Sequence, residues 1–226
     1  MGSTVGQTTL LGLALPIILI HGYAEDSSVW DEWLGWMDEN GLNNAYPVTF
    51  SNDDRCGSVE EHSHELSSIV DSILNDTGSD RVNMIAHSKG GLDARWYISE
   101  NPNKVSSLIM IATPNTGTPA AYMDLTTCSF EGGAGLEDLQ PDSEATQAAD
   151  QPDTDYYTIA GNYSNPCAIV IHRYICYLVE NDGLVTVDSA TSHYKILGTF
   201  GYHHSTILEH RDVYETVLPI LMRFEQ

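Results

Sequence analysis

The residues that most constrain the fold of this chain are 82–91, which read Val-Asn-Met-Ile-Ala-His-Ser-Lys-Gly-Gly. The apolar run stops abruptly before Ser88, and a helix-like segment begins at Leu92. A strand that turns this sharply into a helix needs small residues two positions before and after the apex, because the two elements come close together there. Ala86 and Gly90 occupy those positions. The segment therefore predicts a strand, a tight turn with Ser88 at its apex, and a helix.

Two kinds of site are built on such a turn. Small residues after a strand also occur in ordinary doubly wound turns and in phosphate cradles at helix N-termini. In a nucleophile elbow, the turn lifts the serine hydroxyl clear of the sheet and points the next backbone N–H, here that of Lys89, at the place where an oxyanion forms. Because this donor is a backbone group, replacing Lys89 with alanine is expected to have only a mild effect on kcat. Other segments of the chain favour the nucleophile elbow.

A second buried-strand pattern, at residues 16–20, is followed by His21, Gly22 and Tyr23. In an acyl-transfer enzyme, the loop after such a strand supplies a second oxyanion donor, and the backbone N–H of Tyr23 is the candidate. Gly22 lets the chain approach the site closely, since it has no side chain. We interpret His21 as a structural histidine that braces this loop.

A carboxylate and a base follow later in the chain. Asp182 lies in an Asn-Asp-Gly turn, where it could hydrogen-bond a histidine, although such a sequence also makes an ordinary Asx turn. His203 and His204 follow the strand-like residues 194–199, in a loop where a general base is expected. Serine, then aspartate, then histidine is the order found on an α/β-hydrolase sheet.

These segments resemble the bacterial and archaeal lipases of the α/β-hydrolase superfamily, from about residue 16 to about residue 220. The Ala-His-Ser-Lys-Gly run at 86–90 is similar to the small Bacillus-type lipases. The Asn-Asp-Gly-Leu-Val run at 181–185 and the interval from Asp182 to His204 are similar to the Pseudomonas-type lipases. Residues 112–119 resemble the loop after the next strand in these enzymes, with Asn115 in place of the usual histidine.

The resemblance implies a fold and a set of site residues. The fold is an α/β-hydrolase fold with a mostly parallel central sheet flanked by helices, and residues 1–226 form one domain. The catalytic residues are Ser88, Asp182 and His204, since the spacing from Asp182 favours His204 over its neighbour His203. Thr206 stands at the position of a calcium-ligating aspartate, so no metal or other cofactor is expected.

Apolar patterns place the remaining elements. Besides the strand patterns already named, three more occupy residues 46–50, 105–112 and 156–160. Ser58 and Glu61 form a capping box for a helix that runs to about Asn75. Residues 206–224 are predicted to close the fold as a helix, with a kink or break at Pro219.

Residues 119–154 lose periodicity between two core strands, and a long irregular excursion in a compact domain is usually functional. We interpret this segment as a cap or partial lid over Ser88, with a solvent loop as the alternative. Tyr122, Met123 and Phe130 within it, together with Trp30 near the Tyr23 loop, are candidate substrate-binding residues. For Trp30, core packing is the default interpretation.

The charge balance limits the partners. The 32 acidic residues outnumber the 9 basic ones, for a formal charge of −23, and such a field repels nucleic acid and anionic membrane surfaces. A neutral ester or lipid substrate is not repelled. We therefore expect no nucleic-acid partner, at most transient contact with lipid interfaces, and a monomer.

The cysteines bear on the cellular compartment. Two disulfides would indicate an oxidising environment and a secreted protein, whose signal peptide is not visible in this sequence; four buried thiols are the alternative. The acidic charge also fits the cytoplasm of a salt-adapted organism. The preferred pairing joins Cys167 to Cys176 and Cys56 to Cys128.

The function predicted from these residues is that of a serine hydrolase that cleaves carboxylic esters, a lipase or carboxylesterase, through an acyl-enzyme. An acyltransferase or lactonase would use the same residues. A non-catalytic hydrolase-fold protein that binds a hydrophobic ligand is the alternative from another class. Labelling of Ser88 by a fluorophosphonate discriminates between the enzymes and the binding protein, since a binding protein need not activate its serine.

Overall fold

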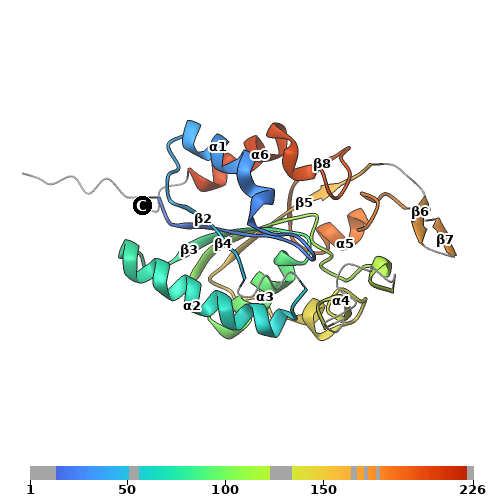
Figure 1. Cartoon of the computed structure of the whole chain (residues 1–226), viewed down its shortest axis with the longest axis horizontal. Helices are drawn as coiled ribbons and strands as arrows, with labels where there is room; N and C mark the ends of the chain where they lie inside the picture. Colours follow the sequence, from blue (N-terminus) through green and yellow to red (C-terminus); the bar gives the residue numbers. More distant parts are fainter. Residues whose placement is uncertain are drawn as a thin grey trace, which may run out of the picture.

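The computed structural model describes residues 14–50, 56–122, 134–163, 167–170, 173–176 and 179–222. Its centre is a six-stranded parallel sheet with the strand order β2-β1-β3-β4-β5-β8 (Figure 1). Its strands are β1 (Ile17–Ile20), β2 (Ala45–Pro47), β3 (Val82–His87), β4 (Val105–Ile111), β5 (Asp155–Gly161) and β8 (Lys195–Phe200). A separate antiparallel hairpin joins β6 (Cys167–Val170) to β7 (Arg173–Cys176). The predicted α/β-hydrolase fold class is confirmed in this mostly parallel architecture.

Helices cover both faces of the sheet (Figure 1). One layer contains α1 (Asp31–Glu39) and α6 (Arg211–Leu221), and the other contains α2 (Val59–Thr77) and α3 (Gly90–Glu100). Two short helices, α4 (Ala134–Glu137) and α5 (Val187–Thr191), lie toward the β5 end of the molecule. Within the described residues, no helix combines the length and the apolar character needed to cross a membrane.

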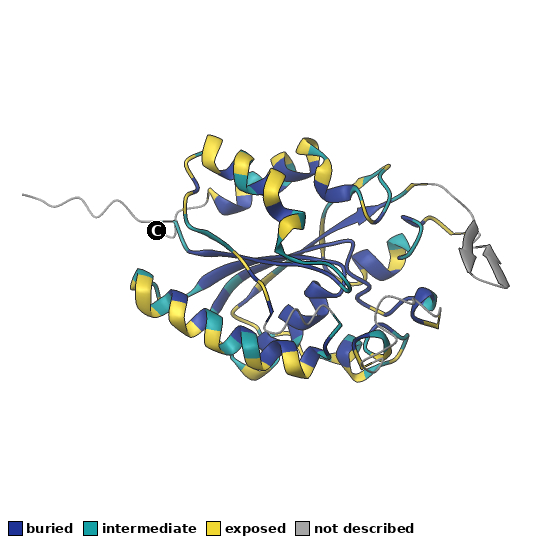
Figure 2. Ribbon diagram, viewed as in Figure 1, coloured by how far each residue is buried: buried dark blue, intermediate teal, exposed yellow. Residues whose placement is uncertain are grey.

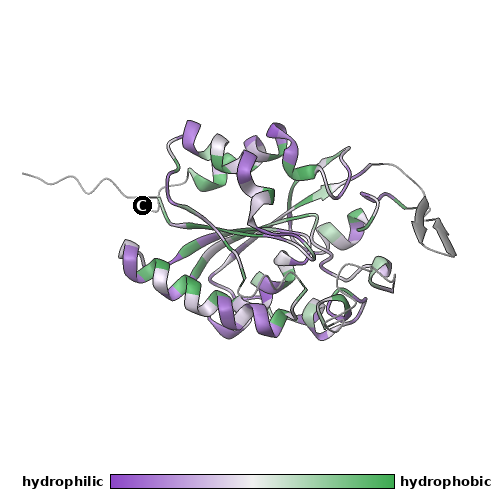
Figure 3. Cartoon of the chain, viewed as in Figure 1, coloured by the Kyte–Doolittle hydropathy of each residue, from purple (hydrophilic) through white to green (hydrophobic). Residues whose placement is uncertain are grey.

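The sheet is buried on both faces because each of its helical layers supplies an apolar core. Successive side chains of a strand point to opposite faces, and β1 follows this rule: Ile17 and Leu19 pack with α1 and α6, whereas Ile18 and Ile20 pack with α2 and α3. Figure 2 shows buried strands between helices whose outer faces are exposed, and Figure 3 shows the polar residues on those outer faces. An apolar run without alternation is what a parallel strand with two covered faces requires.

Local sequence signals explain where two of the helices begin and end. The predicted capping box of α2 is present: the Ser58 hydroxyl accepts from the Glu61 N–H, and the Glu61 carboxylate accepts from the Ser58 N–H. The predicted break at Pro219 is not where the last helix is interrupted. Residues 207–209 form a separate helical turn, His210 is extended, and Pro219 lies inside α6. The break therefore comes before the helix, and the fold tolerates a proline near its last turn.

The described part of the predicted cap consists of short helical turns at Pro119–Tyr122 and Glu144–Gln147 with α4 between them. It packs on the N-terminal ends of α2 and α3, where Leu139 and Ala145 join an apolar cluster with Leu92. Arg95 of α3 donates to the carbonyl oxygens of Thr146 and Ala148 at 3.2 and 3.1 Å. These contacts hold this part of the cap against α2 and α3, and α3 begins just after Ser88.

The cysteine predictions are tested only in part. Cys56 takes part in a disulfide, but Cys128 lies outside the described residues, so their pairing stays a prediction. The strand register sets Cys167 opposite Cys176 in the β6–β7 hairpin. That register is compatible with the predicted bridge, which also stays a prediction.

Candidate active site

Ser88 stands at the apex of the turn between β3 and α3. Its φ is 52°, in the left-handed region that a residue with a side chain rarely adopts. A Cβ at Gly90 would overlap the carbonyl oxygen of His21 and lie 2.8 Å from that of Ile20. A Cβ at Gly91 would overlap the side chain of Thr113. The two glycines therefore permit the close approach that holds the serine in its strained conformation.

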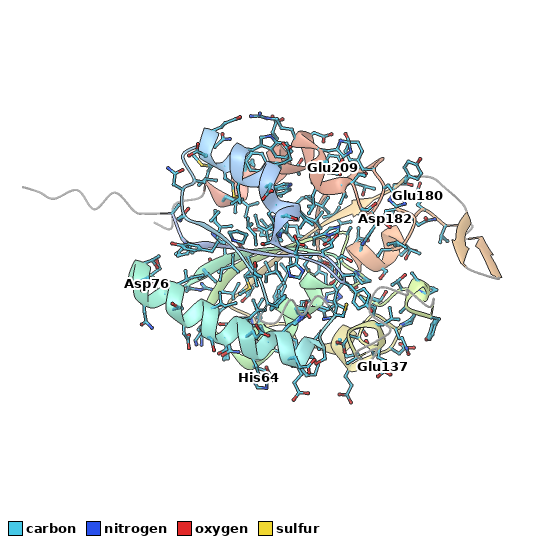
Figure 4. All side chains as sticks on the ribbon, in the orientation of Figure 1. His64, Asp76, Glu137, Glu180, Asp182 and Glu209 are labelled. Atoms are coloured by element: carbon cyan, nitrogen blue, oxygen red, sulfur yellow. The ribbon has the colours of Figure 1, made fainter. Side chains whose placement is uncertain are left out.

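The three residues predicted from the sequence come together at the carboxyl end of the sheet. His204 Nε2 lies 2.9 Å from Ser88 Oγ, and His204 Nδ1 lies 2.8 Å from Asp182 Oδ2. Parallel strands end at the same edge, so loops after β3, β5 and β8 can meet there although they are far apart in sequence. Figure 4 labels Asp182 in this region, just before α5. The hydrogen bonds form one chain from carboxylate to imidazole to hydroxyl.

Asp182 is held rigidly as an ionised acceptor. Its Oδ1 accepts from the backbone N–H groups of Leu184 and Val185 at 3.0 and 2.7 Å. A Cβ at Gly161, the last residue of β5, would lie 2.6 Å from Asp182 Cβ, so the strand end leaves just enough room for the aspartate. Burial, the largest influence, raises the pKa of Asp182, but the His204 imidazole and the two N–H donors outweigh it and the pKa is lowered.

His204 is buried and its pKa is raised. Burial is again the largest single influence and lowers the pKa of His204. Asp182 and, more weakly, Glu25 raise this pKa, and together they outweigh burial. The neighbouring His203 points elsewhere, since its Nδ1 contacts Ser205 Oγ at 3.0 Å and its ring packs edge-on against Tyr163. The structure thus brings His204, and not His203, to Ser88.

Tyr23 and Lys89, the two predicted oxyanion donors, flank Ser88. A Cβ at Gly22 would lie 2.8 Å from Ser88 Cβ, so the loop before Tyr23 touches the serine turn. Lys89 precedes the first residue of α3, where backbone N–H groups have no partner within the helix. Among the described residues, neither amide donates to another protein atom. Both N–H groups are therefore available to a ligand oxygen.

Sequence reasoning missed the buried groups around this turn. Glu25 Oε2 accepts from the Gly22 N–H at 2.7 Å and lies 2.8 Å from His87 Nδ1. The side chain of Lys89 is buried with Asp93, to which its Nζ binds at 2.5 Å. The four-residue interval between Lys89 and Asp93 is a signal for such an ion pair on a helix, but the local sequence does not indicate that the pair is buried.

The four predicted substrate-binding residues are described only in part, and their role stays a prediction. Trp30 has no exposed surface and packs edge-on against Trp33 in the core between α1 and α6, which favours the core-packing interpretation. Tyr122 is 65% exposed. Met123 and Phe130 lie outside the described residues. Among the residues that the structure describes, no group of three His, Cys, Asp or Glu side chains is arranged to hold a metal ion.

Known proteins resemble this chain in sequence and in fold. A family model described as "alpha/beta hydrolase fold" matches residues 16–128. A triacylglycerol lipase of Burkholderia plantarii is 30% identical over 124 residues, which are 53% of this chain and 35% of that protein. A triacylglycerol lipase of Pseudarthrobacter phenanthrenivorans is 32% identical over 111 residues, 47% of this chain and 35% of that protein. The chain thus spans about a third of the length of these relatives.

A solved structure extends the likeness to nearly the whole chain. The crystal structure of the mature form of a Bacillus licheniformis lipase matches with a TM-score of 0.72 and 23% sequence identity, and the match covers 92% of both chains. At that identity the likeness shows the fold alone. Because this match covers 92% of the chain, the shared fold reaches beyond residues 16–128, which the family model matches.

Proposed function

The chain belongs to the alpha/beta hydrolase fold family, and from this premise we propose that it is a serine hydrolase that cleaves carboxylic esters, a lipase or carboxylesterase. One observation carries the proposal: the continuous hydrogen-bond chain from Asp182 through His204 to Ser88. A protein that only binds a hydrophobic ligand has no need of a buried, carboxylate-oriented imidazole on a serine with a positive φ. The relatives named triacylglycerol lipases support the same reaction class.

In the proposed mechanism, Ser88 Oγ attacks the ester carbonyl carbon while His204 Nε2 takes the hydroxyl proton. The backbone N–H groups of Tyr23 and Lys89 bind the oxyanion, each contributing roughly 3 kcal/mol to the transition state. His204 then gives its proton to the departing alcohol, which leaves an acyl group on Ser88. Water attacks this acyl-enzyme with His204 as the base, and the acid is released. Asp182 holds the His204 tautomer and stabilises the imidazolium.

The substrate and the setting are parts of the same proposal. The charge of −23 favours a neutral ester or lipid over an anionic one. We treat residues 1–226 as one monomeric domain in which 119–154 cap the site, and we assign the protein to an oxidising, extracellular setting with Cys167 joined to Cys176. Leu139 and Ala145 of the cap contribute to the apolar cluster that also contacts Tyr23, as an acyl-binding wall would.

The test is hydrolysis of p-nitrophenyl esters with acyl chains from C2 to C16, at low and high salt, by the wild type and by Ser88→Ala. We expect wild-type turnover and a fall of about 10⁴-fold or more in Ser88→Ala. The chain-length optimum separates an esterase from a lipase. A fluorophosphonate should label the wild type and not the variant. Equal inactivity of both proteins, with no labelling, would make the binding-protein alternative the better account.

Two neighbouring histidines provide a matched control for the base. His204→Ala should lose as much activity as Ser88→Ala, because the two residues act as a unit. His203→Ala should keep activity close to that of the wild type, since its ring makes no contact with Ser88. The opposite result, an inactive His203→Ala beside an active His204→Ala, would assign the base to His203 and refute the mechanism as written.

A further inference from the structure

Beside the Ser88–His204–Asp182 chain lies a second pair, the partly buried Glu25 and the buried His87, which the proposed mechanism does not use. His87 is the last residue of β3 and directly precedes Ser88, and Glu25 lies in the loop after β1. Glu25 Oε2 is 2.8 Å from His87 Nδ1, and the side chains are 23% and 2% exposed. The inference drawn from this pair rests on the proposed function, since it concerns how the reacting groups are held.

Glu25 closes the loop that carries the predicted oxyanion donor. Its side chain accepts from the Gly22 N–H at 2.7 Å, and its own N–H donates to the Gly22 carbonyl oxygen at 3.3 Å. Between these two anchor points, Ala24 has a φ of 60°, which costs energy in a residue other than glycine. Tyr23 therefore sits in a tight turn whose two ends are tied together by Glu25.

His87 ties that turn to the loop of the proposed base. Its Nε2 lies 3.1 Å from the backbone carbonyl oxygen of His204, and the two imidazole rings are 5.0 Å apart. The side chain of His204 meanwhile reaches Ser88 Oγ. The Glu25–His87 pair thus joins three segments: the Tyr23 turn, the serine turn and the His204 loop.

Both ring nitrogens of His87 face oxygen atoms, since Nδ1 lies 2.8 Å from Glu25 Oε2 and Nε2 lies 3.1 Å from the His204 carbonyl oxygen. A carboxylate oxygen and a carbonyl oxygen are acceptors only. The two contacts use different edges of one buried ring, so the orientation of His87 sets the distance between the Tyr23 turn and the His204 loop.

We propose that the Glu25–His87 pair is a positioning device, which keeps the Tyr23 turn, the serine turn and the His204 loop in the arrangement that the reaction needs. The titratable side chains facing His87 are Glu25, from the loop after β1, and His204, from the loop after β8. Neither residue of the pair touches the reacting atoms. Their effect on the reaction passes through the backbone of Gly22 and of His204.

The electrostatics of Glu25 agree with this assignment. Burial is the largest influence on the pKa of Glu25 and raises it, but the charge of His87 and the hydrogen bonds from His87 and Gly22 outweigh burial and bring the pKa down to about 2. Glu25 is therefore ionised across the range in which such a hydrolase would work.

The first experiment reads the contact between Glu25 and His87 directly, by ¹H–¹⁵N NMR of the histidine side chains, with the His87→Gln spectrum to identify the signals. We expect Glu25→Gln to shift the ring signals of His87, because it replaces the carboxylate that faces Nδ1. Ring signals of His87 that do not move in Glu25→Gln would overturn the contact on which the proposal rests. This measurement does not depend on any activity, so it is independent of the proposed function.

The second experiment reads positioning. Glu25→Gln should lower kcat for a p-nitrophenyl ester by about 10- to 100-fold with little change in KM, because small displacements of reacting groups cost that much. Labelling by a fluorophosphonate should slow by the same factor. The control is Glu32→Gln on the exposed face of α1, which removes the same charge and should behave as the wild type.

The outcomes separate the two proposals. A fully active Glu25→Gln with an altered His87 spectrum would refute the positioning role while leaving the proposed reaction intact. An active Ser88→Ala would refute the proposed reaction, whatever the spectrum of His87. If Glu25→Gln does not fold, His87→Gln takes its place in the kinetic test with the same expected loss, and full activity there refutes the positioning role.

Discussion

The buried side chain of Lys89 yields the sharpest stability prediction. Its Nζ binds Asp93 Oδ1 at 2.5 Å with both side chains 1% exposed, Asp138 lies 3.9 Å away, and Asp93 Oδ2 is 3.0 Å from His62 Nδ1. Burial, the largest influence, raises the pKa of Asp93, yet Lys89 and His62 outweigh it, so the pKa is lowered and Asp93 is ionised. Lys89→Met would remove the cation and leave a buried carboxylate whose remaining close partner is an imidazole.

Breaking one side of a buried ion pair typically costs about 3–5 kcal/mol, because the uncompensated charge stays in the interior. With a urea m-value of about 2–3 kcal/mol/M for a chain of this size, the unfolding midpoint should fall by about 1–2 M. Lys104→Met is the matched control. Its Nζ binds Asp71 Oδ1 at the same 2.5 Å, but the two side chains are 32% and 51% exposed, so the loss should stay below about 1 kcal/mol.

Urea unfolding at pH 8 of Lys89→Met, Asp93→Leu and the double variant completes the test. The double variant should be more stable than either single variant, since removing both charges removes the desolvation penalty along with the attraction. A loss below about 1 kcal/mol in Lys89→Met, or a double variant no better than the single ones, would refute the reasoning.

The same variant separates stability from catalysis at Lys89. Replacing the Lys89 side chain is expected to have a mild effect on kcat, since the proposed oxyanion donor is the backbone N–H. The effect of this replacement on stability should be large, because the ammonium group is buried. For the folded enzyme, kcat of Lys89→Met should stay within a few-fold of the wild type.

Two further predictions concern the base and the packing of the serine turn. Asp182 raises the pKa of His204, and because a base must be neutral to accept a proton, activity should fall as the pH drops through this raised pKa. In Asp182→Asn the acid limb of the kcat/KM profile should move to lower pH, and kcat should fall by about 10⁴-fold. An acid limb that does not move would contradict the assignment of His204 as the base. Gly90→Ala should lower stability in thermal melts by about 1–3 kcal/mol, because its Cβ meets the carbonyl oxygens that precede Gly22. Gly35→Ala, in open space within α1, should instead gain about 0.5–1 kcal/mol, and equal melts for the two variants would contradict the close packing.

Local interactions explain why much of the fold could be predicted from the sequence. The capping box of α2 involves residues three positions apart, and the serine turn is specified by small residues within two positions of its apex. Element ends were less predictable. Residues 46–50 were expected to form a strand, yet β2 covers Ala45–Pro47, while Val48 and Phe50 are buried beyond the end of the strand. Burial alone gives such residues the apolar pattern of a strand.

The sequence by itself determined the order of the reacting residue types and placed Ser88 and His204 after predicted strands. Parallel strands bring their carboxyl ends to one edge, so Ser88 and His204 are expected near one another, and the order serine, aspartate, histidine adds Asp182 to them. The tertiary structure alone decided which charges are buried and paired. Glu25 meets His87 across 62 residues, and His87 meets the carbonyl of His204 across 117. Such pairings depend on how separate loops pack, and the energy of a charge depends on its burial, which no local pattern records.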